Sequence, residues 1–102
     1  MKYGLKEDVI KKICSIFKKY PSVKKVVIYG SRAKGNYKRG SDIDLTMFGD
    51  HISDQEQTNI FFDIDNLNTP YTIDLSIYRQ IDNEDLQEHI NRVGKVFYQK
   101  DK

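Results

Sequence analysis

Cysteine and proline are scarce in this sequence, and long apolar runs are missing. Cys14 is the single cysteine, so a disulfide framework within the chain is impossible and we expect a cytoplasmic protein. Two prolines and 38% hydrophobic residues indicate a folded globular domain rather than a disordered chain. No apolar run approaches the roughly 18 residues of a membrane-spanning helix. We therefore expect neither a signal peptide nor contact with a membrane.

Charge of one sign is not in large excess either. The formal net charge is only +2, although 31% of the residues are charged, so the chain is not a polycation that coats nucleic acid. Basic residues cluster between Arg32 and Arg39, but Tyr37 is the only aromatic side chain among them, and no stacking motif is present. Direct binding of nucleic acid is not expected. The 102 residues suit one domain, residues 1–102, with one core.

The spacing of apolar residues predicts alternating helices and strands. The link between the first two strands is short, which favours an antiparallel pair, whereas the link from the second to the third is long and helical, which is consistent with a crossover. We predict an α/β or α+β fold in which helices cover a mixed sheet. The predicted helices span residues 5–19, 31–34, 53–67 and 82–93, and the predicted strands span residues 25–29, 42–48, 72–78 and 96–98.

Carboxylates stand inside two of the predicted strands, where aspartate is disfavoured. Asp42 and Asp44 are two residues apart, so their side chains emerge on one face of a strand. Asp74 occupies the same frame, because Ile-Asp-Leu occurs at 43–45 and again at 73–75. Clustered carboxylates repel unless cations lie between them, and all-oxygen ligands select Mg²⁺ or Mn²⁺. On their own, Asp42 and Asp44 would be ordinary solvent-facing residues near a sheet edge.

A glycine–serine turn directly after the first strand supplies the other half of a site. The start of a helix presents free backbone N–H groups and the positive end of its dipole, which both suit phosphate. Gly30 lets the backbone approach closely, and Ser31 can donate its hydroxyl. Arg32 and Lys34 could screen a triphosphate. The pattern predicts a phosphate site facing a metal site, where two ions would activate an attacking hydroxyl and stabilise a leaving pyrophosphate.

Other chemistries lack the residues they require. His51 and His89 have no partners at zinc-ligand spacing. Ser31 has no histidine and aspartate arranged for a nucleophilic triad, and the sequence contains no P-loop motif. These observations leave phosphoryl chemistry as the best-supported interpretation.

Residues 30–35 (Gly-Ser-Arg-Ala-Lys-Gly), followed by residues 41–45 (Ser-Asp-Ile-Asp-Leu), resemble the signature of the polymerase-beta-like nucleotidyltransferase superfamily. More narrowly, they resemble the minimal nucleotidyltransferase (MNT) proteins. These are short single domains that are commonly paired with a HEPN-domain protein in bacterial and archaeal toxin–antitoxin modules. Asp74 extends the motif, every motif position is in place, and the predicted element order fits nearly the whole chain. The resemblance implies the palm-like nucleotidyltransferase fold.

The resemblance also implies a role for each matching residue. Gly30 and Ser31 would hold the nucleotide triphosphate, Asp42 and Asp44 would bind two Mg²⁺ ions, and Asp74 would bind the catalytic ion and help to deprotonate the acceptor. The implied reaction transfers AMP from ATP and releases pyrophosphate. The implied acceptor is a tyrosine hydroxyl on a HEPN ribonuclease toxin, so an antitoxin role in a hetero-oligomer is expected.

Two alternatives stay open at this point. The chain could neutralise its partner by binding alone, since it is small and exposed aromatics such as Tyr78 or Tyr98 would suit a partner surface. It could instead transfer a nucleotide to a small molecule or to RNA, because the same motif serves all of these reactions.

Overall fold

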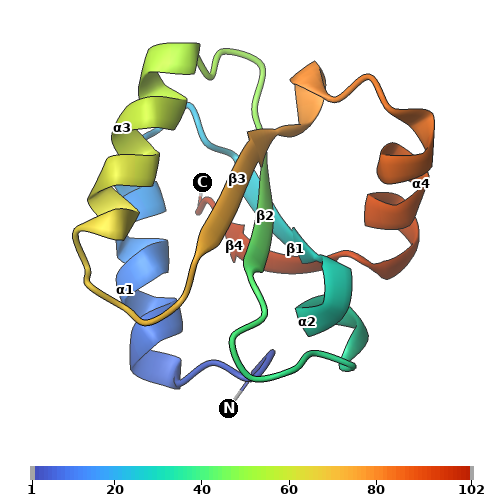
Figure 1. Cartoon of the computed structure of the whole chain (residues 1–102). Coiled ribbons are helices and arrows are strands. Elements are labelled where there is room, and N and C mark those ends of the chain that lie inside the picture. The colour runs from blue at the N-terminus through green and yellow to red at the C-terminus, as the bar shows by residue number, and fades with distance from the viewer. Residues whose placement is uncertain (1, 102) are drawn as a thin grey trace.

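The computed structural model describes residues 2–101. Within these residues, four helices cover the two faces of one four-stranded sheet (Figure 1). In chain order the elements are α1 (Glu7–Lys18), β1 (Lys25–Tyr29), α2 (Gly30–Lys34), β2 (Ile43–Phe48), α3 (Asp54–Asp65), β3 (Ile73–Ile77), a 3-10 turn (Tyr78–Gln80), α4 (Glu84–Val93) and β4 (Lys95–Gln99).

The sheet has the mixed topology that the sequence predicts. Its strand order is β3-β2-β1-β4. The short link from β1 to β2 gives an antiparallel pair, and the long link through α3 returns the chain to lay β3 parallel to β2. β4 is antiparallel to β1 on the other side. The predicted α/β or α+β fold is therefore confirmed.

Several element ends differ from the prediction by one or two residues. α3 ends at Asp65 rather than at Leu67, and β4 is longer than predicted, at Lys95–Gln99. Asp42 lies just outside β2, which begins at Ile43. Such terminal residues depend on capping and pairing partners that periodicity does not reveal.

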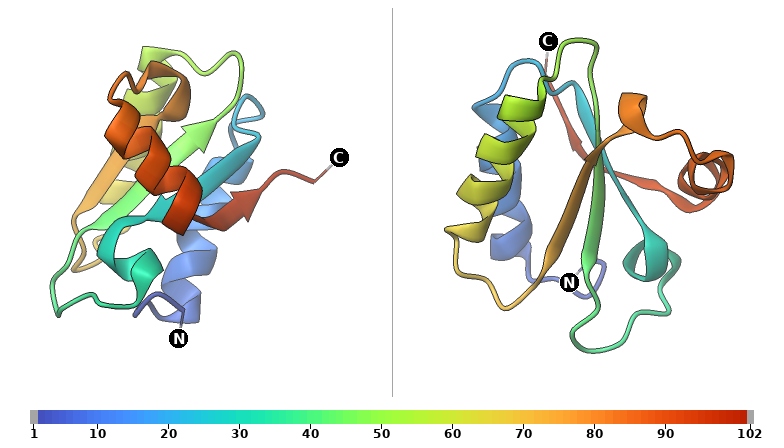
Figure 2. Two further views of the ribbon diagram at one scale, coloured as in Figure 1. Left: turned by 90° about the vertical axis from the view of Figure 1, so that its right-hand side faces the viewer. Right: turned by 45° about the horizontal axis from the view of Figure 1, so that its top comes forward.

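The main core lies between the sheet and the α1–α3 layer. Ile13 and Phe17 of α1 pack there, and both are fully buried. A smaller cluster on the opposite face joins Val27 and Tyr29 of β1 to Ile90 of α4. Figure 2 shows α1 and α3 together on one side of the sheet and α2 and α4 on the other. The smaller apolar cluster leaves room for polar side chains on the α2–α4 face.

The exposed aromatic side chains differ from those that we predicted. Tyr78 is half-buried because its ring stacks on Phe48 at 4.4 Å between centroids. Tyr98 is half-buried against α1. The exposed aromatics of the described elements include Phe61 and Phe62 of α3, at 37% and 56% exposure. Among residues 2–101, no helix is both long enough and apolar enough to cross a lipid bilayer.

A capping box fixes the start of α3. The Ser53 Oγ accepts a hydrogen bond from the backbone N–H of Glu56 at 3.1 Å. The Glu56 carboxylate accepts one from the Ser53 N–H at 3.2 Å and another from the Ser22 hydroxyl at 2.8 Å. Two helix N-terminal donors are thereby satisfied. Because α3 is the crossover between β2 and β3, this cap supports the link that makes those strands parallel.

We expect Ser53→Ala to lower the free energy of unfolding by about 1 kcal/mol, because the cap at the start of α3 loses its acceptor. Urea denaturation followed by circular dichroism measures the change. Ser15→Ala is the matched control, since the exposed Ser15 hydroxyl donates only to the carbonyl of Lys12 in its own helix. An equal loss in both variants would contradict the role of the cap.

Candidate active site

The site forms where β1 ends and β2 and β3 begin. Strand register aligns Tyr29 of β1 with Asp44 of β2, and Asp44 with Asp74 of β3. Register partners on adjacent strands project to the same face. These residues form one row, here called the Asp44 row (Tyr29, Asp44 and Asp74). Tyr29 packs in the α4 cluster, so the row faces the α2–α4 side. The two predicted strand carboxylates are therefore direct neighbours.

Asp42 lies beside this row but outside the strand ladder. It is exposed, and its charge acts on Asp44. The next residue is fixed to β3, since the Ile43 N–H donates to the Thr72 carbonyl at 2.9 Å. The three predicted carboxylates thus come from one end of two paired strands, as the repeated Ile-Asp-Leu tripeptide suggested.

Mutual repulsion and burial both act on Asp44. They raise its pKa from 3.8 to about 6, with burial as the largest cause, followed by the charges of Asp74 and Asp42. A half-buried carboxylate with two anionic neighbours is strained electrostatically unless a cation joins it. Its chemistry suits a hard cation, because all of the available donors are carboxylate oxygens.

The described residues do not form a complete metal site on their own. Across residues 2–101, no group of three His, Cys, Asp or Glu side chains is arranged to hold a metal ion. The donor set still fits Mg²⁺, which keeps few protein ligands and fills its shell with water and phosphate oxygens. A cation at Asp44 and Asp74 would therefore need ligands from a nucleotide or from solvent.

Gly30 brings the start of α2 against Asp44. Its φ of +75° is a left-handed conformation that glycine adopts without strain. A Cβ at this position would also overlap the Oδ2 of Asp44. Both constraints select glycine, and they place the backbone of the predicted phosphate turn in contact with the predicted metal ligand. Ser31 follows directly and is half-buried.

His89 is a neighbour of this turn that the sequence did not indicate. Its Nε2 accepts a hydrogen bond from the Gly30 N–H at 3.3 Å. Its ring lies edge-on to Tyr29, with 6.2 Å between centroids. A lone histidine on a helix carries no ligand spacing, and only the packing of α4 against β1 and α2 brings it here. No local sequence signal could have found it.

Tyr29 and Ser76 complete the polar surface around Asp44. Burial raises the pKa of the Tyr29 hydroxyl, the nearby Ser76 hydroxyl lowers it, and the charges of Asp74 and Asp44 raise it again. The Ser76 hydroxyl also donates to the buried Thr46 hydroxyl at 2.8 Å. These contacts order the face next to the carboxylates without adding another charge.

The two predicted basic residues of α2 point in different directions. Lys34 is exposed. Arg32 is buried at 3% exposure, and its guanidinium donates to backbone carbonyls of Tyr3 and Ser41. The structure therefore brings Gly30 against Asp44, with Ser31 next to it in the chain, and turns the head of Arg32 into the loop before β2.

Comparison with known proteins adds the family and the fold. A family model described as "Polymerase beta, Nucleotidyltransferase" matches residues 11–102. No curated protein matches the chain in sequence. A crystal structure of a toxin–antitoxin with AMP-PNP has a TM-score of 0.71 at 21% identity, and the match covers 94% of this chain and 75% of that chain.

Two further solved structures share the arrangement of elements. The toxin–antitoxin MntA–HepT structure has a TM-score of 0.69 at 15% identity, over 93% of this chain and 74% of that one. The tri-AMPylated Shewanella oneidensis HEPN toxin in complex with MNT antitoxin gives a TM-score of 0.69 at 15% identity, over 94% and 74%. At these identities the likeness shows a common fold.

We expect Asp44→Asn to stabilise the folded protein at pH 7.5 without divalent cations, because it removes a half-buried charge that its neighbours repel. Solvent partly screens that charge, so the gain should be only about 1 kcal/mol. The raised pKa of Asp44 means that its stabilising, protonated form is fully present below about pH 4. That contribution is lost as the pH rises through about 6. The gap between variant and wild type should therefore open between pH 4 and 7, as measured by thermal melting.

Asp65→Asn is the control for this experiment. Asp65 is exposed at the end of α3, on the opposite side of the sheet from the Asp44 row. Because it lacks the burial and the carboxylate neighbours of Asp44, the stability difference for Asp65→Asn should be smaller than that for Asp44→Asn. If the difference in melting temperature between Asp44→Asn and wild type stayed constant from pH 4 to 7, the ionised Asp44 would not be the source of the destabilisation.

Proposed function

This chain belongs to the polymerase beta nucleotidyltransferase family, and on that premise we propose that it transfers AMP from ATP to a hydroxyl group of a protein partner. The observation that carries the proposal is the position of Asp44, which lies between the Gly30 turn and Asp74. A phosphate-binding turn and paired carboxylates are the two halves that nucleotidyl transfer requires. The similar structures that contain AMP-PNP and an AMPylated toxin support AMP as the transferred group.

The phosphates of ATP would bind at the start of α2. The Gly30 backbone N–H, the Ser31 hydroxyl and the exposed Lys34 ammonium are the donors available there. In the free protein the Gly30 N–H donates to His89. A phosphate oxygen would take this N–H in place of the imidazole, so nucleotide binding would involve a shift of the His89 side chain.

Asp42, Asp44 and Asp74 would hold two Mg²⁺ ions, or Mn²⁺, together with phosphate oxygens. When bound, these ions neutralise the carboxylates and stabilise the charge on pyrophosphate. Asp44 must be ionised to bind them, and its raised pKa of about 6 means that binding weakens as the pH falls below that value. Asp74 is exposed on β3, at the edge of the sheet, where it can accept the proton of an approaching hydroxyl. The acceptor would therefore come in from the β3 side.

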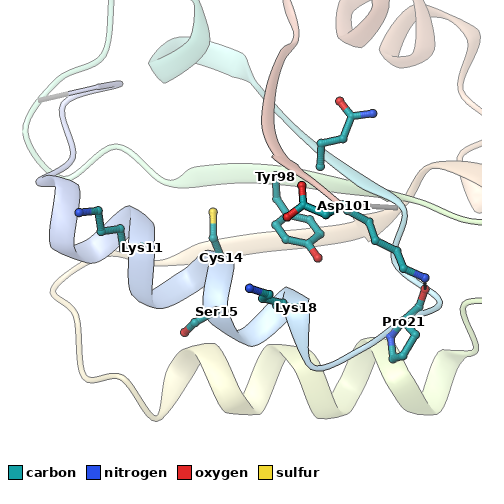
Figure 3. Close-up of a pocket in the computed structure, with 9 residues that line it drawn as sticks. Lys11, Cys14, Ser15, Lys18, Pro21, Tyr98 and Asp101 are labelled. Carbon is teal, nitrogen blue, oxygen red and sulfur yellow. Dashed lines mark hydrogen bonds between the residues drawn. The ribbon is translucent and has the colours of Figure 1, made fainter.

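The acceptor would be a tyrosine on a HEPN-domain protein, and the chain would act as its antitoxin. The carboxylate face offers an open edge, as expected when a partner supplies the rest of the cleft. A separate groove of about 490 Å³ between α1 and the end of β4 is not part of this site (Figure 3). It lies on the α1 side of the sheet, lined by Cys14, Lys18 and Tyr98 among others. We infer that the partner supplies the acceptor surface beside Asp74.

We expect the wild-type protein with Mg²⁺ to move label from α-labelled ATP onto its purified HEPN-domain partner. The double variant Asp42→Asn/Asp44→Asn should lose at least about 100-fold of this activity, because the transition-state charge loses its metal ligands. Gel autoradiography measures the transfer. Asp65→Asn, which changes an exposed carboxylate away from the site, is the matched control and should transfer label normally.

A partner that is neutralised without receiving label would contradict the enzymatic proposal and favour inhibition by binding alone. Label that appears on RNA or on a small molecule, but not on protein, would contradict a protein acceptor and identify the acceptor as one of those two classes. Equal labelling by wild type and the double variant would remove the proposed roles of both carboxylates.

A further inference from the structure

Arg32 is a buried cation, and within residues 2–101 its side-chain hydrogen bonds go to the backbone of other segments. Its Nε and Nη2 donate to the Ser41 carbonyl at 3.0 and 2.9 Å, and its Nη1 donates to the Tyr3 carbonyl at 2.9 Å. Hydrogen bonds from a charged donor are among the stronger ones in proteins. The guanidinium therefore ties α2 to two segments that are remote from it in sequence.

Aromatic rings and a glycine enclose this guanidinium. The Cζ of Arg32 lies 5.2 Å from the ring centroid of Tyr37 and 5.0 Å from that of Tyr71. Gly4 packs against the same group, because a Cβ there would overlap the Tyr37 ring and lie 2.9 Å from Nη1. Gly4 also has a φ of +72°. Arg32 lines a hollow of about 320 Å³ together with Lys38 and Arg39, but at 3% exposure its guanidinium offers a phosphate little free surface.

The two ends of Arg32 belong to the two halves of the proposed site. Its backbone lies in α2, two residues after Gly30. Its head holds the carbonyl of Ser41, which is part of the peptide bond that leads into Asp42. Asp42 precedes β2, and the next N–H, that of Ile43, donates to Thr72. The backbone of Asp42 is thus held by Arg32 on one side and by the start of β3 on the other.

We propose that Arg32 is a positioning residue that sets the spacing between the phosphate turn and Asp42, and that it is not a ligand of the triphosphate. The inference deepens the proposed function and rests on it. Transfer requires the phosphates and the carboxylates at a fixed separation, and a displacement of about 1 Å can cost about 100-fold in rate. The Tyr3 anchor lies outside residues 11–102, which the family model matches, so this part of the arrangement belongs to the chain's own N-terminal turn.

Arg79, an exposed residue of the 3-10 turn after β3, offers a control at the other end of β2. Its Nη2 donates to the Ile52 carbonyl at 2.8 Å, and its Nη1 donates to the carbonyls of Gly49 and Asp50 at 3.2 and 3.4 Å. Arg32 therefore holds the loop that enters β2, and Arg79 holds the loop that leaves it. Arg79→Met should lower stability through the same kind of lost contact without changing the spacing of the site.

The experiment compares Arg32→Met, Arg32→Lys and Arg79→Met with wild type. We expect Arg32→Met to lower kcat by about 10- to 100-fold and to raise the Mg²⁺ concentration at half-maximal rate. The Kd of ATP measured in EDTA should stay within about twofold of wild type, because no ground-state contact to the phosphates is lost. Arg32→Lys should show the same defect, since lysine keeps the charge but lacks the planar fork. Arg79→Met should keep kcat and the Mg²⁺ requirement.

Opposite results would overturn the inference. A Kd of ATP in EDTA that rises about tenfold in Arg32→Met and recovers in Arg32→Lys would make Arg32 a phosphate ligand acting through its charge. A loss of kcat in Arg79→Met equal to that in Arg32→Met would reduce both residues to general stabilisers. Should Arg32→Met fail to fold, Gly4→Ala displaces the packing over the same guanidinium and should lower kcat in the same way.

A measurement without turnover separates this inference from the proposed function. In amide hydrogen exchange followed by NMR, Arg32→Lys should speed exchange at Ile43, whereas Arg79→Met should leave it unchanged. Unchanged exchange at Ile43 in Arg32→Lys would refute the positioning role even in a protein that transfers nothing. A wild-type protein without transfer, combined with faster exchange in Arg32→Lys, would instead refute only the proposed function.

Discussion

The parallel pairing of β2 with β3 is the constraint on which the rest of this structure depends. It places Asp44 directly beside Asp74 and fixes the side of the sheet on which both emerge. The pairing exists because α3 carries the chain back along the sheet as a crossover. The antiparallel pairing of β1 with β2 then adds the Gly30 turn on the other side of Asp44. Burial is the largest cause of the raised pKa of Asp44, and the charge of Asp74, which this pairing brings alongside, is the next.

The two faces of the sheet contribute unequally to the buried core. The α1–α3 face holds most of the buried side chains, whereas the α2–α4 face has a small cluster around Ile90. Stability from the first face offsets the repulsion on the second, since a carboxylate pair can persist only where the rest of the fold tolerates it. α2 is short and has little core of its own, so its position depends on Arg32 and on the contact between Gly30 and Asp44.

Much of this architecture could be predicted from the sequence, because its signals are local. Apolar periodicity gave the order of helices and strands, and the repeated Ile-Asp-Leu tripeptide placed Asp44 and Asp74 in equivalent frames. The direction of the Arg32 side chain could not be predicted, since its partners lie 29 and 9 residues away in sequence. The same holds for His89, which meets Gly30 across 59 residues. Side-chain partners that are set by packing leave no pattern in a single sequence.

The strain on Asp44 also has a consequence for the lifetime of the protein. A ligand that binds only the folded state lowers the unfolded population by mass action. A cation bound at the Asp44 row would do so and would also remove the repulsion between its carboxylates. With cation and nucleotide bound as proposed, the chain would be cleaved more slowly by proteases that act on its unfolded form. The abundance of this domain in a cell would then follow the supply of its own substrate.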